Sequence, residues 1–182
     1  MNAEQFKETL IPVSQKLFRL SYRFLENTQE AEDVVQEVFA KLWNMRDKLG
    51  EIKNHEAFAT TITKNLCLDR LKAKKTVSLD HNDIGLQNHA TEKNNPYQET
   101  EAQNNKLIIK QIVETLPDQQ RTIMIMRDFE EYSYEEIEEH TGLNLNYIRV
   151  NLSRARKQVR DEFIKFHEYG TQRNKEAAGK IL

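Results

Sequence analysis

Basic side chains gather on one predicted helix near the C-terminus, where they could bind a negatively charged partner. Residues 144–160 contain no acid, and they carry Arg149, Arg154, Arg156, Lys157 and Arg160. At about 100° per residue, an apolar stripe forms one face of this helix. That stripe consists of Ile148, Leu152, Ala155 and Val159. Because Arg149, Ser153 and Lys157 lie opposite it, the helix presents a basic face suited to phosphates.

The segment before this helix is acidic and carries helix start and stop signals. Residues 128–140 contain seven acids and no base. Ser133 and Glu136 have the spacing of a capping box, and Gly142 can take the left-handed conformation that ends a helix. Asn144 can cap the next helix. A short helix, a glycine turn and a basic helix form the layout of a helix-turn-helix. A second interpretation remains open, in which the acidic and basic helices are simply two solvated faces of an ordinary helical bundle.

Apolar residues at helical spacing predict two helical domains. The first stripe consists of Phe6, Leu10, Val13, Leu17, Leu20 and Phe24, with Pro12 beginning or kinking a helix. Further helices are predicted from Thr28 to Trp43 and over residues 56–75, and periodicity resumes at Leu107. The predicted fold class is all-α, with two small helical domains joined by a flexible linker. The boundaries are an N-terminal bundle at 1–75, a linker at 76–104, a helix-turn-helix domain at 105–167 and a frayed tail at 168–182.

Composition limits the possible classes of protein. Five glycines and three prolines in 182 residues leave little room for the turns of sandwiches, barrels and βαβ folds. Cys67 is the single cysteine, so an internal disulfide is excluded and a reducing, cytoplasmic compartment is expected. No secretory signal or membrane span is predicted. A net charge of −2 argues against a protein that coats nucleic acid unaided.

Two blocks of sequence resemble the extracytoplasmic-function (ECF) sigma factors of the sigma-70 family. The segment LPDQQRTIMIMRDFEEYSYEEIEEHTGLNLNYIRVNLSRARKQVR is similar to the family's C-terminal promoter-binding domain. AEDVVQEVFAKLW resembles its most recognisable N-terminal motif, and KNLCLDRLKAKK resembles the helix that follows. The blocks occur in the family's order and are joined by a linker of similar character.

The resemblance implies a transcription initiation factor without catalytic residues, cofactor, metal or small-molecule substrate. The first domain would hold the RNA polymerase core and open the −10 promoter element, and the second would read the −35 element as duplex. Implied core contacts are Asp33, Gln36 and Glu37. Implied −10 contacts are Lys53, Asn54, His55, Asn65, Asp69, Arg70 and Lys72. Implied −35 contacts are Asn146, Tyr147, Arg149, Val150, Ser153, Arg154, Arg156 and Lys157.

The chain departs from the family pattern at two places. Phe58 and Thr61 stand where many members have tryptophan and arginine, which changes the expected wall of the −10 loop and one phosphate contact. Asn146 and Tyr147 replace the usual Gly-Thr at the start of the recognition helix, so the base preference of other members cannot be transferred. His55 is as readily a helix-start residue as a base reader.

Other functions stay open at this point. A conventional helix-turn-helix regulator would bind its operator unaided, whereas a sigma factor would need core polymerase. An adaptor without DNA contact would not need the basic face of the last helix. An enzyme is disfavoured because the histidines are scattered and no glycine-rich phosphate loop is present. The family commonly has an anti-sigma factor, which is an expected partner together with promoter DNA and the polymerase core.

Overall fold

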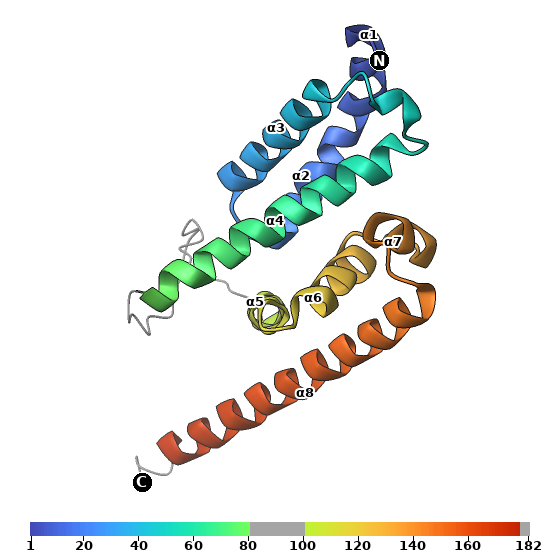
Figure 1. The fold of residues 1–182 in the computed structure, drawn as a ribbon. Helices are drawn as coiled ribbons and strands as arrows, with labels where there is room; N and C mark the ends of the chain where they lie inside the picture. Colours follow the sequence, from blue (N-terminus) through green and yellow to red (C-terminus); the bar gives the residue numbers. More distant parts are fainter. Residues whose placement is uncertain (81–100, 179–182) are drawn as a thin grey trace. The chain divides into compact units, whose positions relative to one another are not determined.

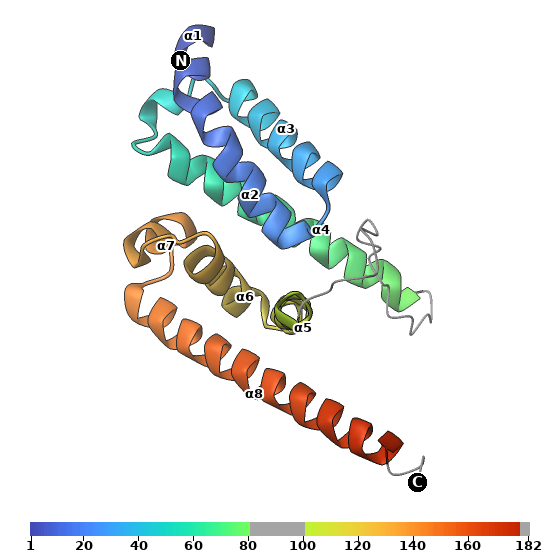
Figure 2. The same cartoon turned by 180° about the vertical axis from the view of Figure 1, so that it is seen from behind.

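The N-terminal half of the chain folds as helices that lie alongside one another (Figures 1 and 2). The computed structural model describes residues 1–80 and 101–178. The elements in this half are α1 (Ala3–Leu10), η1 (Ile11–Val13), α2 (Ser14–Leu25), α3 (Thr28–Asn44), η2 (Leu49–Glu51) and α4 (His55–Asp80). Helices α2, α3 and α4 contact one another pairwise. Together they confirm the predicted three-helix bundle, preceded by the short α1.

Local sequence explains where these helices begin and which faces they bury. Pro12 lies in the 3₁₀ turn η1, which separates α1 from α2. The Asn27 side chain accepts a hydrogen bond from the Glu30 amide at 3.0 Å and so begins α3. The bundle core is built from apolar side chains with little or no exposed surface. These include Leu10, Leu17, Leu20, Phe24, Val34, Val38 and Leu42.

The C-terminal half contains short helices followed by one long helix. Its elements are α5 (Glu101–Glu114), α6 (Asp118–Met124), η3 (Ile125–Phe129), α7 (Tyr134–Thr141) and α8 (Leu145–Ala178). η3 is a π-helical turn that continues directly from α6. All elements of the described residues are helical, so the predicted all-α class is confirmed, and no helix among them is long and apolar enough to cross a membrane.

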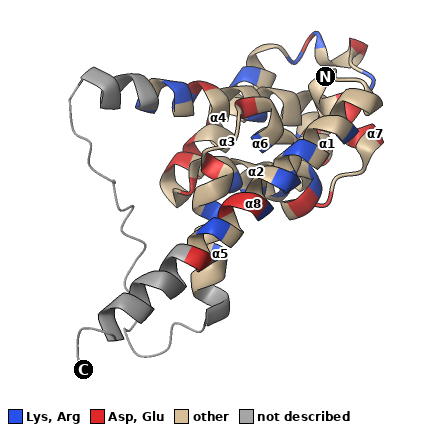
Figure 3. Ribbon diagram, turned by 90° about the horizontal axis from the view of Figure 1, so that it is seen from below, with Lys and Arg blue, Asp and Glu red and all other residues tan. Residues whose placement is uncertain are grey.

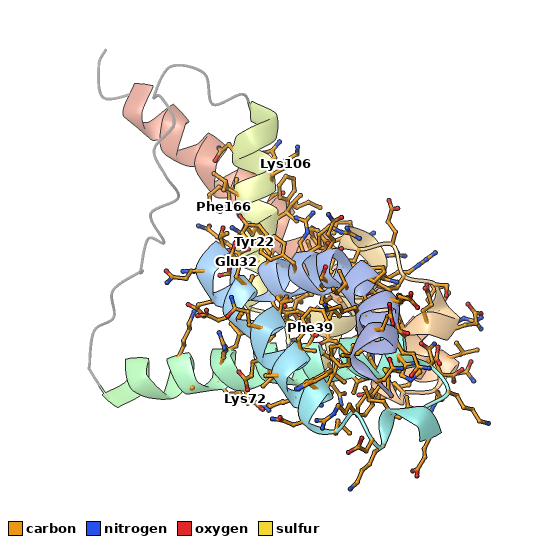
Figure 4. All side chains as sticks on the ribbon, turned by 90° about the horizontal axis from the view of Figure 1, so that it is seen from above. Tyr22, Glu32, Phe39, Lys72, Lys106 and Phe166 are labelled. Carbon is orange, nitrogen blue, oxygen red and sulfur yellow. The ribbon has the colours of Figure 1, made fainter. Side chains whose placement is uncertain are left out.

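Contacts divide the described residues into two compact units. The first contains residues 1–80 and 122–149, and the second contains residues 101–121 and 150–178. Within the first, α7 contacts α4, and η3 contacts α2. Within the second, the His167 Nε2 atom lies 3.1 Å from the Asn105 Oδ1 atom and so joins α8 to α5. The neighbouring side chains Lys106 and Phe166 are labelled in Figure 4.

Two helices are longer than their apolar patterns predict. α4 ends at Asp80 rather than at residue 75, and α8 continues to Ala178 through the stretch predicted to fray. The predicted linker at 76–104 is therefore helical at 76–80 and again from Glu101, and the rest of it lies outside the described residues. The extension of α8 contains Glu, Lys, Arg and Ala, whose helix propensity does not depend on an apolar stripe.

Candidate nucleic-acid interface

The turn between α7 and α8 has the geometry that the sequence predicts. The Glu136 amide donates to Ser133 Oγ at 3.1 Å, and the Ser133 amide donates to a Glu136 carboxylate oxygen at 2.7 Å. This reciprocal pair is the capping box of α7. Gly142 ends the helix with a φ of 70°, a conformation that glycine adopts without strain. Asn144 then accepts a hydrogen bond from the Tyr147 amide at 2.8 Å and begins α8.

The start of α8 separates a buried face from an exposed one. Ile148, Leu152, Ala155 and Val159 are buried, as their spacing predicts. The residues proposed to face −35 DNA are exposed. They are Asn146, Tyr147, Arg149, Val150, Ser153, Arg154, Arg156 and Lys157. Val150 is 48% exposed although it is apolar, which leaves a methyl-bearing side chain among the basic ones. Such a surface offers cations for phosphates and both polar and apolar groups for base edges.

Two residues near this turn, Arg127 and Tyr134, were not identified from the sequence. The Arg127 and Arg149 guanidinium carbons lie 4.9 Å and 5.5 Å from the centre of the Tyr134 ring. Arg127 belongs to η3 and is more than twenty positions away from Arg149 in the chain, so helical periodicity cannot connect them. Only the folded turn brings both cations to one ring.

The first −10 candidates cluster at the start of α4, where they also serve the helix. Asn54 caps α4 by accepting from the Ala57 amide at 3.0 Å, and its Nδ2 atom donates to Glu139 at 2.8 Å. The His55 Nε2 atom lies 2.8 Å from the Leu49 carbonyl oxygen. Lys53 is exposed beside them. Asn54 and His55 are thus held in place by helix-start contacts, and a strand that used Asn54 Nδ2 would have to displace Glu139.

The other −10 candidates lie along α4. Asn65 and Asp69 are exposed and help to line a groove of about 480 Å³ between α3 and α4. The remaining lining residues are Lys41, Asn44, Met45, Ile62 and Leu66. Lys72 is exposed on the same helix (Figure 4). Arg70 instead bonds to α3, donating to the Glu30 carbonyl at 3.1 Å and to Glu37 at 3.3 Å. Its guanidinium group therefore joins α4 to α3.

The candidate polymerase contacts on α3 differ in their surroundings. Asp33 and Gln36 are exposed. Glu37 lies 2.9 Å from Lys41 and 3.3 Å from Arg70. The Lys41 hydrogen bond, aided by Arg70, lowers the pKa of Glu37 below its ordinary value. Asp33 and Gln36 are the more accessible pair, whereas a partner that bound Glu37 would compete with two internal cations.

The acidic segment around α7 supplies partners to the basic residues of α2, and Figure 3 colours these charges by sign. Glu130 is bound by two guanidinium groups, Arg23 at 3.1 Å and Arg19 at 3.3 Å. The Glu130 side chain is only 4% exposed, so it is shielded from water while its partners are half exposed. Lys16 lies 3.7 Å from Glu136 and 4.4 Å from the centre of the Tyr132 ring. Part of the acidic surface predicted from the sequence is therefore neutralised within the first unit.

His140 is a buried titratable residue on α7. It is 3% exposed, and among the described residues neither ring nitrogen has a hydrogen-bond partner. The Tyr132 ring packs against it edge-on at 5.1 Å. Burial, aided by the positive charge of Lys16, lowers the pKa of His140, while Glu139, Glu136 and Glu56 oppose the shift. The folded protein therefore favours neutral imidazole.

Stability is expected to fall as the pH decreases below about 6.5, the ordinary pKa of histidine. In that range the unfolded chain binds a proton at His140 that the folded chain resists, and the loss grows until the pH reaches the lower folded pKa. Glu37 and Glu136, whose pKa values are also lowered, contribute losses only near and below their ordinary value of 4.5. Urea unfolding of the full chain at pH 7.5, 6.5 and 5.5 measures the slope. His140→Leu should flatten it, and an unchanged slope would contradict this account.

The described residues neither group metal-ligating side chains nor expose the cysteine thiol. They contain no group of three or more His, Cys, Asp or Glu side chains placed to hold a metal ion. Cys67 is buried, and burial raises the pKa of its thiol to about 12. A thiol protonated at neutral pH is a poor nucleophile and metal ligand. Cys67 thus acts as a small core residue.

The capped helix α7, the turn at Gly142 and the exposed basic face of α8 are features of helix-turn-helix proteins, and this chain carries a second helical bundle. Comparison with family models extends this class: sigma-70 region 2 matches residues 12–77, and sigma-70 region 4 matches residues 106–159. The chain belongs to the sigma-70 family. The two matched regions are those of a factor that directs RNA polymerase to promoters, and the family is in general not enzymatic.

Individual relatives agree with this assignment. The chain is similar to the ECF RNA polymerase sigma factor SigE of Mycolicibacterium smegmatis, with 27% identity over 82% of this chain and 58% of that protein. It is also similar to the sigma factor SigV of Bacillus subtilis, with 26% identity over 83% of this chain and 86% of that one. The chain thus spans little more than half of the mycobacterial relative but most of the Bacillus one.

A solved structure shares the fold. It is the sigma factor RpoE of Bartonella quintana, in a co-crystal with the anti-sigma factor NepR. The superposition has a TM-score of 0.65 and 23% sequence identity, and it covers 90% of this chain and 98% of that one.

Proposed function

We propose that the chain binds bacterial core RNA polymerase through its N-terminal bundle, residues 1–75, and reads the −35 element through the domain at 105–167. The bundle would also hold the melted −10 strand with the candidates on α4. Residues 76–104 would connect the two functions, and no catalytic step would be performed by this chain. Its action would take place in the cytoplasm, where the polymerase is.

One observation carries the proposal most strongly, namely the division of α8 into a buried apolar stripe and an exposed face that carries Arg149, Arg154 and Lys157. Because the stripe is buried, the opposite face of the helix is the one exposed to a partner. The short capped helix α7 and the left-handed turn at Gly142 precede it, as in helix-turn-helix proteins that insert their second helix into the major groove.

The direct test is transcription with purified components. Core polymerase, the full chain and duplex DNA from the promoter of its own operon should give a transcript with one defined start. Core polymerase alone and the chain alone should give none. If the chain alone bound one duplex site specifically at nanomolar concentration, and core polymerase did not change this binding, the chain would instead be a conventional helix-turn-helix regulator.

An anti-sigma factor is the second partner that we propose. The Bartonella quintana relative is crystallised with a protein of that class. A partner of this kind would lower the amount of chain available to core polymerase. Addition of the purified partner to the transcription reaction should suppress the specific transcript, and added chain should restore it.

Asp33→Ala or Gln36→Ala is expected to weaken binding to core polymerase by several-fold without changing the stability of the chain. Both side chains are exposed on α3, and one interfacial hydrogen bond contributes about 0.5–1.5 kcal/mol. Titration of labelled chain with core polymerase measures the affinity. Glu32→Ala, an exposed acid on the same helix (Figure 4), is the matched control and should bind like the parent. Unchanged affinity in both test variants would remove α3 from the polymerase interface.

A further inference from the structure

The position of Tyr134 is fixed by the backbone rather than by its own side chain. Tyr134 is the first residue of α7 and directly follows the capping residue Ser133. The two hydrogen bonds of the capping box, at 3.1 Å and 2.7 Å, hold this helix start in one geometry. The half-buried ring of Tyr134 is consequently a stable platform beside the turn into α8.

Two cations share this platform. The Arg127 guanidinium carbon is 4.9 Å from the ring centre, and that of Arg149 is 5.5 Å from it. Both distances fall within the range of about 6 Å in which an aromatic ring attracts a guanidinium group. Arg127 is also anchored, because its Nη1 atom donates to the Tyr132 carbonyl at 2.7 Å. Arg149 is exposed, and the ring is a neighbour that limits where its guanidinium group can lie.

This limitation matters for reading a base. An arginine that makes two hydrogen bonds to guanine must hold its planar guanidinium group in one orientation. An arginine side chain that is otherwise unrestricted loses much rotational freedom on binding in this way. A ring that already restricts the guanidinium group reduces this loss, which is the effect of preorganisation. Among the cation–π contacts of the described residues, Tyr134 is contacted by Arg127 and Arg149, and Arg154 takes part in no such contact.

We propose that Tyr134 is a positioning residue for Arg149, so that sequence preference at the base pair read by Arg149 depends on the Tyr134 ring. This rests on the proposed function, in which Arg149 faces the −35 element. The role differs from a purely structural one because it concerns one base pair only. Preference at the base pair read by Arg154 should stay as it is.

The experiment is a matrix of −35 substitutions, transcribed at fixed salt by core polymerase with the full chain. Arg149→Ala first identifies the base pair that Arg149 reads. Tyr134→Leu, which removes the ring but keeps an apolar side chain, should then reduce discrimination at this pair by about 3- to 5-fold. Tyr134→Phe, which keeps the ring, should retain it. In the background of Arg149→Ala, Tyr134→Leu should cause no further loss at this pair.

A second variant covers the case in which Tyr134→Leu fails to fold. Pentafluorophenylalanine incorporated at position 134 keeps the shape of the ring but reverses its electrostatic character, so it should lower discrimination as leucine does. Loss of activity on all promoters alike, or normal discrimination with the fluorinated ring, would overturn the positioning role while leaving the proposed function intact. If Arg149→Ala itself left every base preference unchanged, the assignment of Arg149 as a base reader and the role of Tyr134 would both be wrong.

Discussion

Val38→Asp is expected to abolish cooperative folding of the N-terminal bundle and, with it, binding to core polymerase. Val38 lies on α3 with no exposed surface and belongs to the core shared by α2, α3 and α4. A carboxylate without a partner at such a site costs about 3–5 kcal/mol, and the lost packing of the valine adds to this. Small domains have a total stability of only about 5–15 kcal/mol. Most of the folding free energy would therefore be lost.

Thermal unfolding followed by circular dichroism measures this effect in the full chain. Ala40→Asp is the matched control, because it places the same charge on the same helix at an exposed position. It should stay within about 0.5 kcal/mol of the parent. A Val38→Asp protein that unfolded cooperatively at the parent temperature would contradict the assignment of Val38 to the core.

The features predicted from the sequence are those that neighbouring residues determine. The capping box at Ser133, the left-handed Gly142 and the buried stripe of α8 each depend on residue types a few positions apart. The Asn27 cap of α3 is of the same kind. Local backbone chemistry and helical spacing are sufficient for such features, so they could be placed without knowledge of the rest of the fold.

The features that were missed depend on residues distant in the chain. Arg19 and Arg23 are 111 and 107 positions from Glu130, and Asn54 is 85 positions from Glu139. None of these pairings leaves a periodic signal in the sequence. Arg70 illustrates the consequence for the site. Its place in the motif implies a −10 contact, and the structure adds contacts of its guanidinium group with Glu37 and the Glu30 carbonyl that the sequence does not indicate.

The helices α4 and α8 are longer than the sequence predicts, and the reason is not a contact between distant residues. The apolar stripe predicts earlier ends for α4 and α8, and both helices continue beyond it, to Asp80 and Ala178. In the extension of α8, glutamate, lysine, arginine and alanine favour the helix by propensity alone. The end of an apolar stripe marks where burial stops, which is not necessarily where a helix stops.

Arg149→Ala and Arg154→Ala should each relax the preference for one −35 base pair, with a cost of about 1–3 kcal/mol on the preferred sequence. Both side chains are exposed on α8, and a guanidinium group can bind the two acceptors of guanine at once. Lys157→Ala is the contrasting variant. A lysine that binds phosphate contributes equally to every sequence, so its loss should weaken binding uniformly and reduce the salt dependence.

Binding of the holoenzyme to a set of −35 substitutions, measured at several salt concentrations, separates these two outcomes. A base reader changes the order of preferred sequences at constant salt, whereas a phosphate contact changes the slope against salt and leaves the order intact. If both arginine variants kept the parental order at every −35 position, α8 would be a basic helix that attracts DNA without reading it. Sequence preference would then have to come from other exposed residues of the same helix, with Asn146, Val150 and Ser153 the next to be replaced.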